Sequence, residues 1–263
     1  MSDFQLFQID AFSREVFSGN PAAVIVLDQW LATDLMQQVA MENNLSETVF
    51  VCAVDGGFNI RWFTPQVEVD LCGHATLAAA YVLFKEQLAA GDRICFFSGS
   101  GPLSVTRDGE LLALDFPSRP GVPLHDVAAF EEAIGASVTA AFQARDTLLI
   151  LDSQQQVQGI KPDLVKLAAL DTFAVIISAP GDDCDFVSRF FAPNAGINED
   201  PVTGSAHCTL VPYWAKRLRK KQLHARQLSP RRGELFCREM GDRVSIGGYC
   251  CEYLRGTIFL PDG

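Results

Sequence analysis

The segment Ser188–Leu210, SRFFAPNAGINEDPVTGSAHCTL, decides the fold because the first half of the chain carries a second copy of its pattern. Arg189–Asn194 (RFFAPN) matches Arg61–Gln66 (RWFTPQ) position by position. Each copy is followed by a glycine that opens an apolar segment, Gly73 in GHA and Gly204 in GSA. Self-similarity of this kind indicates a duplicated architecture. We therefore interpret the chain as two related halves, each a set of strands that leads into one helix beginning at glycine.

The similarity between the two halves extends upstream, and it indicates two domains. Glu47-Thr48 leads into VFV much as Asp171-Thr172 leads into FAVII. A length of 263 residues also favours two domains. We place them at residues 1–117 and 118–263, with the boundary near Pro117.

The segment Gly73–Glu86 is apolar on every face of the helix that it predicts. Such a helix must be surrounded by protein, since any exposed side would leave apolar surface in water. A strongly curved sheet wrapped round it is the simplest enclosure, and the predicted strands are mostly joined by short turns. We therefore predict an α+β fold of two similar, pseudo-symmetric domains, each a barrel-like sheet round a central helix.

Composition excludes several classes of partner. The net charge of −11 disfavours sequence-independent binding to nucleic acid or to an anionic membrane. The basic run Lys216–Lys221 falls where a helix ends, and cations there complement the helix dipole. The eight cysteines show no C-x2-C pair, and no apolar run is long enough for a membrane span or a signal peptide. We expect a cytoplasmic protein without disulfides.

The two glycine-started helices predict where chemistry occurs. If a pseudo-twofold axis relates the halves, both helix N-termini can face one cleft between the domains. Each N-terminus offers unpaired N–H groups and a partial positive charge. Together they suit a carboxylate, or the enolate-like charge formed when a carbon acid loses its proton. Such a site requires a base and no metal.

Glu47 and His74 are the first candidates for this chemistry. Glu47 opens an apolar strand, where it is either a carboxylate facing water or a general base in the cleft. His74 lies in the first turn of its helix, where the dipole disfavours imidazolium. We predict a neutral His74 that donates a hydrogen bond to a developing oxyanion.

The second helix start offers Asp200 and Ser205. Both residue types are preferred helix caps, but one cap suffices for one helix, so the other is left for substrate. A zinc site formed by Cys72, His74, His207 and Cys208 is an alternative, although structural zinc sites normally show closer cysteine spacing.

Six motifs together resemble the PhzF-like (phenazine biosynthesis-like) isomerase family, which has the diaminopimelate epimerase-like fold. They are GNPAAV (Gly19–Val24), NLSETVFV (Asn44–Val51), RWFTP (Arg61–Pro65), LCGHAT (Leu71–Thr76), LDFP (Leu114–Pro117) and GINEDPVTGSAH (Gly196–His207). The resemblance covers nearly the whole chain. It implies two barrel-and-helix domains with the active site between them, and it allows the last strand to return to the first domain.

The resemblance also implies roles for individual residues. Glu47 becomes the catalytic acid/base, supported by His74, Asp200 and Ser205. Asn20, Gly73 and Gly204 become substrate-binding residues. The implied reaction is a cofactor-independent isomerisation of a small carboxylate-bearing metabolite by carbon-to-carbon proton transfer, catalysed by a homodimer.

Two other functions stay open. Related epimerases use two thiols, and Cys72 precedes Gly73 as the first of these would, but Thr203 precedes Gly204 in the second half. A thiol-dependent racemase or epimerase using Cys72 is therefore one alternative. A catalytically silent ligand-binding protein on the same fold is the other.

Overall fold

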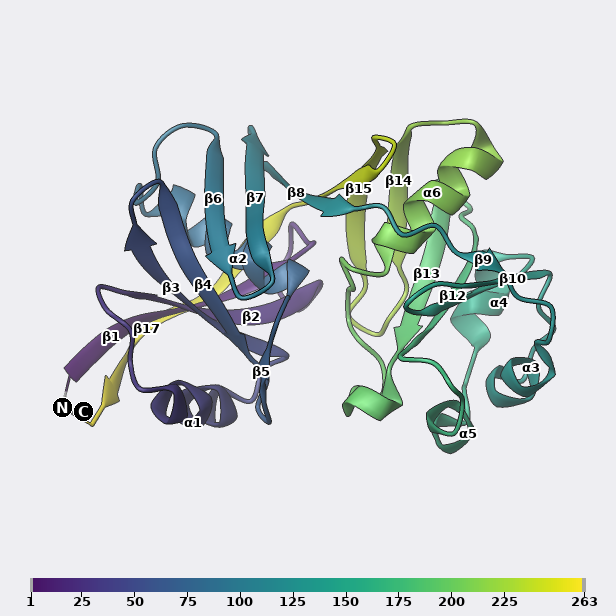
Figure 1. Cartoon of the computed structure of the whole chain (residues 1–263), viewed down its shortest axis with the longest axis horizontal. Helices are drawn as coiled ribbons and strands as arrows, with labels where there is room; N and C mark the ends of the chain where they lie inside the picture. Colours follow the sequence, from purple (N-terminus) through teal and green to yellow (C-terminus); the bar gives the residue numbers. More distant parts are fainter. Residues whose placement is uncertain (1, 262–263) are drawn as a thin grey trace. The chain divides into compact units, whose positions relative to one another are not determined.

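The computed structural model describes residues 2–261, which divide into two compact units. Unit 1 comprises Met1–Asp115 and Gly247–Gly263, and unit 2 comprises Phe116–Ile246. The last strand, β17 (Cys250–Leu260), pairs antiparallel with β1 (Ser2–Ala11), and Figure 1 shows the two running side by side. The chain therefore ends in the unit in which it begins.

Unit 1 is built from strands and two helices. Besides β1 and β17, its elements are β2 (Asn20–Leu27), α1 (Thr33–Asn43), β3 (Glu47–Val54), β4 (Gly57–Phe63), β5 (Glu68–Val69), α2 (Gly73–Lys85), β6 (Arg93–Ser98), β7 (Gly101–Asp108) and β8 (Leu111–Pro117), whose last two residues lie in unit 2. Strand β1 pairs antiparallel with β2, β2 parallel with β3, and β3 antiparallel with β4. Strand β4 then pairs parallel with β6, and β6 antiparallel with β7.

Unit 2 repeats this plan. Its elements are β9 (Val122–Pro123), α3 (Ala128–Ile134), β10 (Ala140–Gln143), β11 (Thr147–Ile150), α4 (Gln154–Gly159), α5 (Leu164–Ala168), β12 (Val175–Pro180), β13 (Phe186–Phe191), η1 (Pro193–Ala195), α6 (His207–Leu218), β14 (Gln222–Gln227), β15 (Gly233–Glu239) and β16 (Arg243–Gly248), whose last two residues lie in unit 1. The pairings β10–β11, β12–β13 and β14–β15 are antiparallel, and β11–β12 and β13–β14 are parallel.

The order of parallel and antiparallel pairings is therefore the same in both units, with α2 and α6 at equivalent places. The register agrees as well, because Val49 faces Trp62 in unit 1 and Ile176 faces Phe190 in unit 2. The RWF and RFF segments thus occupy equivalent strands. The predicted duplicated α+β fold is confirmed.

The same register corrects the upstream match. Thr48 faces Phe63, and Val175 faces Phe191, so Thr48 corresponds to Val175. The matching of Glu47-Thr48 to Asp171-Thr172 is wrong, because β12 begins only at Val175. The residue equivalent to Glu47 is Ala174, which carries no carboxylate.

Helix α2 forms the centre of unit 1, as its sequence predicts. All but three of its residues are buried, and the helix contacts β1, β2, β3, β7 and β17. Each large apolar side chain, such as Leu77 or Leu83, contributes about 2 kcal/mol through burial. The alanines between them have little volume, which lets the strands approach closely.

Helix α6 is buried on every face in its first turn, His207–Val211, and on one face beyond it. Cys208, Val211 and Trp214 are buried, and its basic last turn is exposed. Within residues 2–261, no helix is long and apolar enough to span a membrane.

Candidate active site

Glu47 and His74 come together at one end of unit 1. Helix α1 ends at Asn43, Asn44 follows in the left-handed conformation, and β3 begins at Glu47. His74 is the second residue of α2. Both residues are buried, and Glu47 Oε2 lies 2.9 Å from His74 Nε2. The sequence alternative of a Glu47 carboxylate facing water is therefore wrong.

The other edge of the His74 ring contacts Asn20 and Cys72. Asn20 Nδ2 lies 3.1 Å from Nδ1 of the ring, and Cys72 Sγ lies 3.5 Å from the same nitrogen. Since the amide N–H₂ and the thiol S–H are both donors, Nδ1 accepts and the ring proton belongs on Nε2, facing Glu47. This tautomer is assigned from the hydrogen-bond network.

Asn20 is held in place by a glycine. Gly19 has a φ of +70°, and a Cβ there would lie 2.2 Å from the carbonyl oxygen of Ala11. Only glycine therefore lets the chain turn sharply enough to begin β2 with a fully buried Asn20. The GNP sequence thus fixes one side of the His74 environment.

The neighbours of His74 favour its protonated form, whereas the α2 dipole disfavours it. Burial lowers the pKa of His74, but its interactions with Cys72 and Glu47 outweigh burial, and the pKa lies well above its usual value. A neutral His74 stays a prediction, because the donors at Nδ1 suit the neutral ring, whereas the Glu47 carboxylate favours the imidazolium. Burial raises the pKa of the Cys72 thiol, and Glu47 raises it further.

The cluster does not have the geometry of a metal site. Donor atoms of Glu47, Cys72 and His74 lie within 4.8 Å of one another. However, Cys72 faces Nδ1 of the ring and Glu47 faces Nε2, so one ion could not use both with the same imidazole nitrogen. His207, a member of the zinc alternative, is engaged at Nδ1 with the Thr203 carbonyl, 2.9 Å away. The residues present therefore fit a hydrogen-bonded acid/base cluster better.

In unit 2, Asp200 lies in the loop that leads to α6. Its backbone N–H donates to the Phe190 carbonyl, 3.0 Å away, and its side chain accepts from the Thr203 hydroxyl. The Gln227 amide donates to the Asp200 carbonyl at 2.8 Å and accepts from the Thr203 N–H at 2.9 Å. The loop is thus tied to β13 and β14. Sequence reasoning missed Gln227, since nothing in β14 distinguishes it.

Ser205 lies directly after Gly204, two residues before α6 begins at His207. The sequence placed the helix start at about Ser205, so the observed start is slightly later. Ser205 Oγ accepts a hydrogen bond of 3.2 Å from Arg145. Arg145 and its neighbour Asp146 were also missed, because they lie in the turn between β10 and β11, far from any motif.

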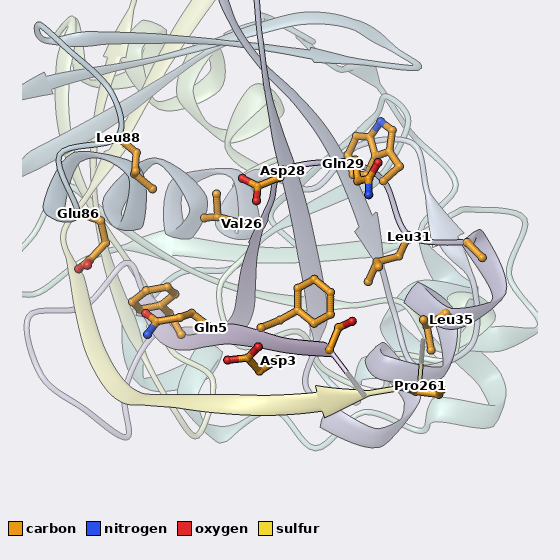
Figure 2. A pocket seen from close by; sticks show the side chains of 15 residues that line it. Asp3, Gln5, Val26, Asp28, Gln29, Leu31, Leu35, Glu86, Leu88 and Pro261 are labelled. Atoms are coloured by element: carbon orange, nitrogen blue, oxygen red, sulfur yellow. The ribbon is translucent and has the colours of Figure 1, made fainter. Parts of the chain in front are cut away.

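A separate cavity of about 730 Å³ lies elsewhere in unit 1 (Figure 2). It is lined by residues that include Val26, Asp28 and Leu35, and by none of the predicted site residues. Strands β2 and β3 are parallel with Ala22 opposite Glu47, so Val26 and Asp28 lie toward the other end of the strands. The cavity and the Glu47 cluster are therefore distinct.

The fold and the buried Glu47–His74 pair define a duplicated α+β protein with an acid/base cluster at the start of a central helix. The family model for phenazine biosynthesis-like proteins matches residues 9–252. This chain belongs to that family, which is the PhzF family.

Relatives and solved structures agree along nearly the whole length. A Pseudomonas aeruginosa protein named an uncharacterized isomerase is 51% identical, covering 97% of this chain and 98% of the relative. A human phenazine biosynthesis-like domain-containing protein is 38% identical, covering 96% and 98%. The crystal structure of a PhzF family protein from Enterococcus faecalis is 46% identical with a TM-score of 0.97, covering 98% and 100%.

More distant solved structures share the fold alone. A hydroxyproline epimerase from Agrobacterium vitis, 10% identical, covers 99% of this chain with a TM-score of 0.65, and 93% of its own chain is covered. This chain and that epimerase therefore share a fold.

Proposed function

We propose that this chain is an isomerase that moves a proton between carbon atoms of a small carboxylate-bearing metabolite, with Glu47 as the single general acid/base. The observation that carries the proposal is the buried Glu47 carboxylate, 2.9 Å from a His74 ring that Asn20 contacts on its opposite edge. A carboxylate held in this way has a fixed direction for proton transfer.

The proposed reaction has two proton transfers. Glu47 removes a proton from a carbon next to the substrate carboxylate or a conjugated system, and the electron pair of the C–H bond spreads into that system. The resulting enolate-like charge is stabilised by the N–H groups of Gly73 and His74 at the start of α2 and by the His74 ring. Protonated Glu47 then returns the proton to a second carbon, which yields the isomer and restores the carboxylate.

A single base is favoured because the duplication is asymmetric. Ala174 occupies the position of Glu47 in unit 2, and Thr203 occupies the position of Cys72. A two-base scheme would need a second titratable group at one of these positions. The raised pKa of Cys72 also disfavours the thiolate that a thiol-dependent racemase requires.

The remaining predicted residues take supporting parts in the proposal. Asp200 and Ser205 are proposed as further catalytic residues, and Asn20, Gly73 and Gly204 as substrate-binding residues. The proposed protein needs no cofactor, acts in the cytoplasm and forms a homodimer, which sedimentation equilibrium would test.

The function is tested by isotope exchange. The protein is incubated in D₂O with a panel of small unsaturated carboxylates and amino acids, and deuterium at carbon is followed by NMR. The proposal expects incorporation that Glu47→Gln abolishes. Incorporation at the wild-type rate in Glu47→Gln would remove Glu47 from its role, and no incorporation in any substrate would favour the silent binding protein.

A further inference from the structure

Arg145 connects the β10–β11 turn of unit 2 to the start of α6. Its Nη2 lies 3.2 Å from Ser205 Oγ, and its guanidinium carbon lies 4.8 Å from the centre of the Phe173 ring. The turn therefore brings a permanent positive charge to a serine of the proposed site.

Asp146 fixes the direction of this guanidinium. Its carboxylate accepts from Arg145 Nε at 2.8 Å and from Nη2 at 2.9 Å, which is a bidentate pair. Asp146 is only 2% exposed, whereas the Arg145 side chain is 38% exposed. A buried carboxylate is unfavourable unless it is paired, so Asp146 requires the arginine to stay in this position.

Arg145 and Ser205 each keep a hydrogen-bond donor that is not used. Arg145 gives Nε and both Nη2 hydrogens to Asp146 and Ser205, so its two Nη1 hydrogens have no partner among the described residues. Ser205 Oγ accepts from the arginine and donates to no other group in residues 2–261, which leaves its O–H proton available. Two adjacent donors of this kind match the two oxygens of a carboxylate.

We propose that Arg145 is a specificity-determining residue whose Nη1, together with the Ser205 hydroxyl, binds the carboxylate of the substrate, with Asp146 as its positioning residue. Because Asp146 already balances one positive charge, the subsite offers directed donors rather than a large net charge. This suits a singly charged carboxylate better than a doubly charged phosphate. The inference rests on the proposed function in that Ser205 belongs to the proposed site.

The test uses benzoate as the carboxylate probe and benzamide as its uncharged counterpart, with binding followed by NMR shifts of the Ser205 and Ala206 amides. The test variant is the double substitution Arg145→Gln with Asp146→Asn, which removes both charges and leaves no buried carboxylate unpaired. Arg217→Gln is the matched control, since Arg217 also lies in unit 2 and its Nη1 bonds the Tyr213 hydroxyl at 2.7 Å.

We expect the wild type and Arg217→Gln to bind benzoate more tightly than benzamide, and the double variant to lose about tenfold or more of its benzoate affinity. If the double variant fails to fold, Arg145→Lys replaces it in the test. This variant should lose less benzoate affinity, since lysine keeps the charge but not the planar guanidinium. Equal binding of benzoate and benzamide by the wild type, or wild-type benzoate affinity in the double variant or in Arg145→Lys, would overturn the proposal.

The outcome is separable from that of the proposed function. Glu47→Gln should abolish deuterium exchange and leave benzoate affinity unchanged. Exchange that survives in Glu47→Gln contradicts the acid/base role alone, whereas wild-type benzoate affinity in the Arg145→Gln, Asp146→Asn variant contradicts the role of Arg145 alone.

Discussion

His74 Nε2 and Glu47 Oε2 lie 2.9 Å apart inside unit 1, although one residue begins a strand and the other begins a helix. The pair brings a carboxylate to the positive end of the α2 dipole, and both groups are buried. The predictions below test what this relationship does for catalysis and for stability.

Glu47→Gln should lower the rate of deuterium incorporation by at least about 10²-fold, because the amide cannot remove a proton. Glu47→Asp keeps the carboxylate but moves it back by one methylene, so it should retain part of the activity. The rates are measured by NMR in D₂O, and circular dichroism checks that both variants are folded. Equal rates in Glu47→Gln and Glu47→Asp would show that the carboxylate itself is not used.

Asn20→Ala should lower kcat more than it changes KM, because it removes a donor that holds the Nδ1 edge of the His74 ring. The loss should be about tenfold, the order expected for one hydrogen bond to a functional group. Asn43→Ala is the control, since Asn43 Nδ2 donates to Thr48 Oγ1 at 3.0 Å in the same unit and not to the His74 ring. An equal loss in both variants would indicate a general structural effect.

Cys72→Ser should keep most of the activity, since the buried thiol has a raised pKa and is protonated at neutral pH. For the same reason, iodoacetamide should label the half-buried Cys95 before Cys72, as judged by mass spectrometry of peptides. Inactivation by Cys72 alkylation that substrate prevents, together with an inactive Cys72→Ser, would instead establish the thiol-dependent racemase.

His207 should make the protein less stable in acid. Burial lowers its pKa to about 4. An unfolded histidine has a pKa of about 6.5, so between these values the unfolded state binds a proton that the folded state excludes. Stability is therefore present above pH 6.5 and lost as the pH falls toward 4, by about 3 kcal/mol. Urea unfolding of wild type and His207→Gln should show this difference, and parallel pH profiles would contradict it.

His74 should change the free energy of unfolding with pH in the opposite direction to His207, and at higher pH. Its folded pKa is raised, so its contribution to stability is complete below about pH 6.5 and is lost as the pH rises through the folded value. The free energy of unfolding of wild type should fall with rising pH more steeply than that of His74→Gln. A wild-type profile that is flat over the same alkaline range would show that the Glu47 carboxylate does not stabilise the imidazolium.

The repeat of RWF and RFF and the all-apolar Gly73–Glu86 segment predicted the duplicated fold correctly, although the second helix begins at His207 and not at Gly204. These signals are local, because periodicity and small turn residues act within a few positions of the chain. The domain boundary near Pro117 stays a prediction. The upstream match to Asp171-Thr172 was wrong because sequence similarity cannot set a strand register, whereas pairing across the sheet can.

The sequence by itself determined the architecture, the family resemblance and the choice of Glu47 and His74, since residue type and spacing carry that information. Only the tertiary structure decided that Asn20 and Glu47 contact opposite edges of one imidazole, and that Arg145 reaches Ser205. These contacts join segments far apart in the chain, so they depend on how strands pair and helices pack. The charge of His74 likewise depends on neighbours in space, because electrostatic interactions act across distance and not along the sequence.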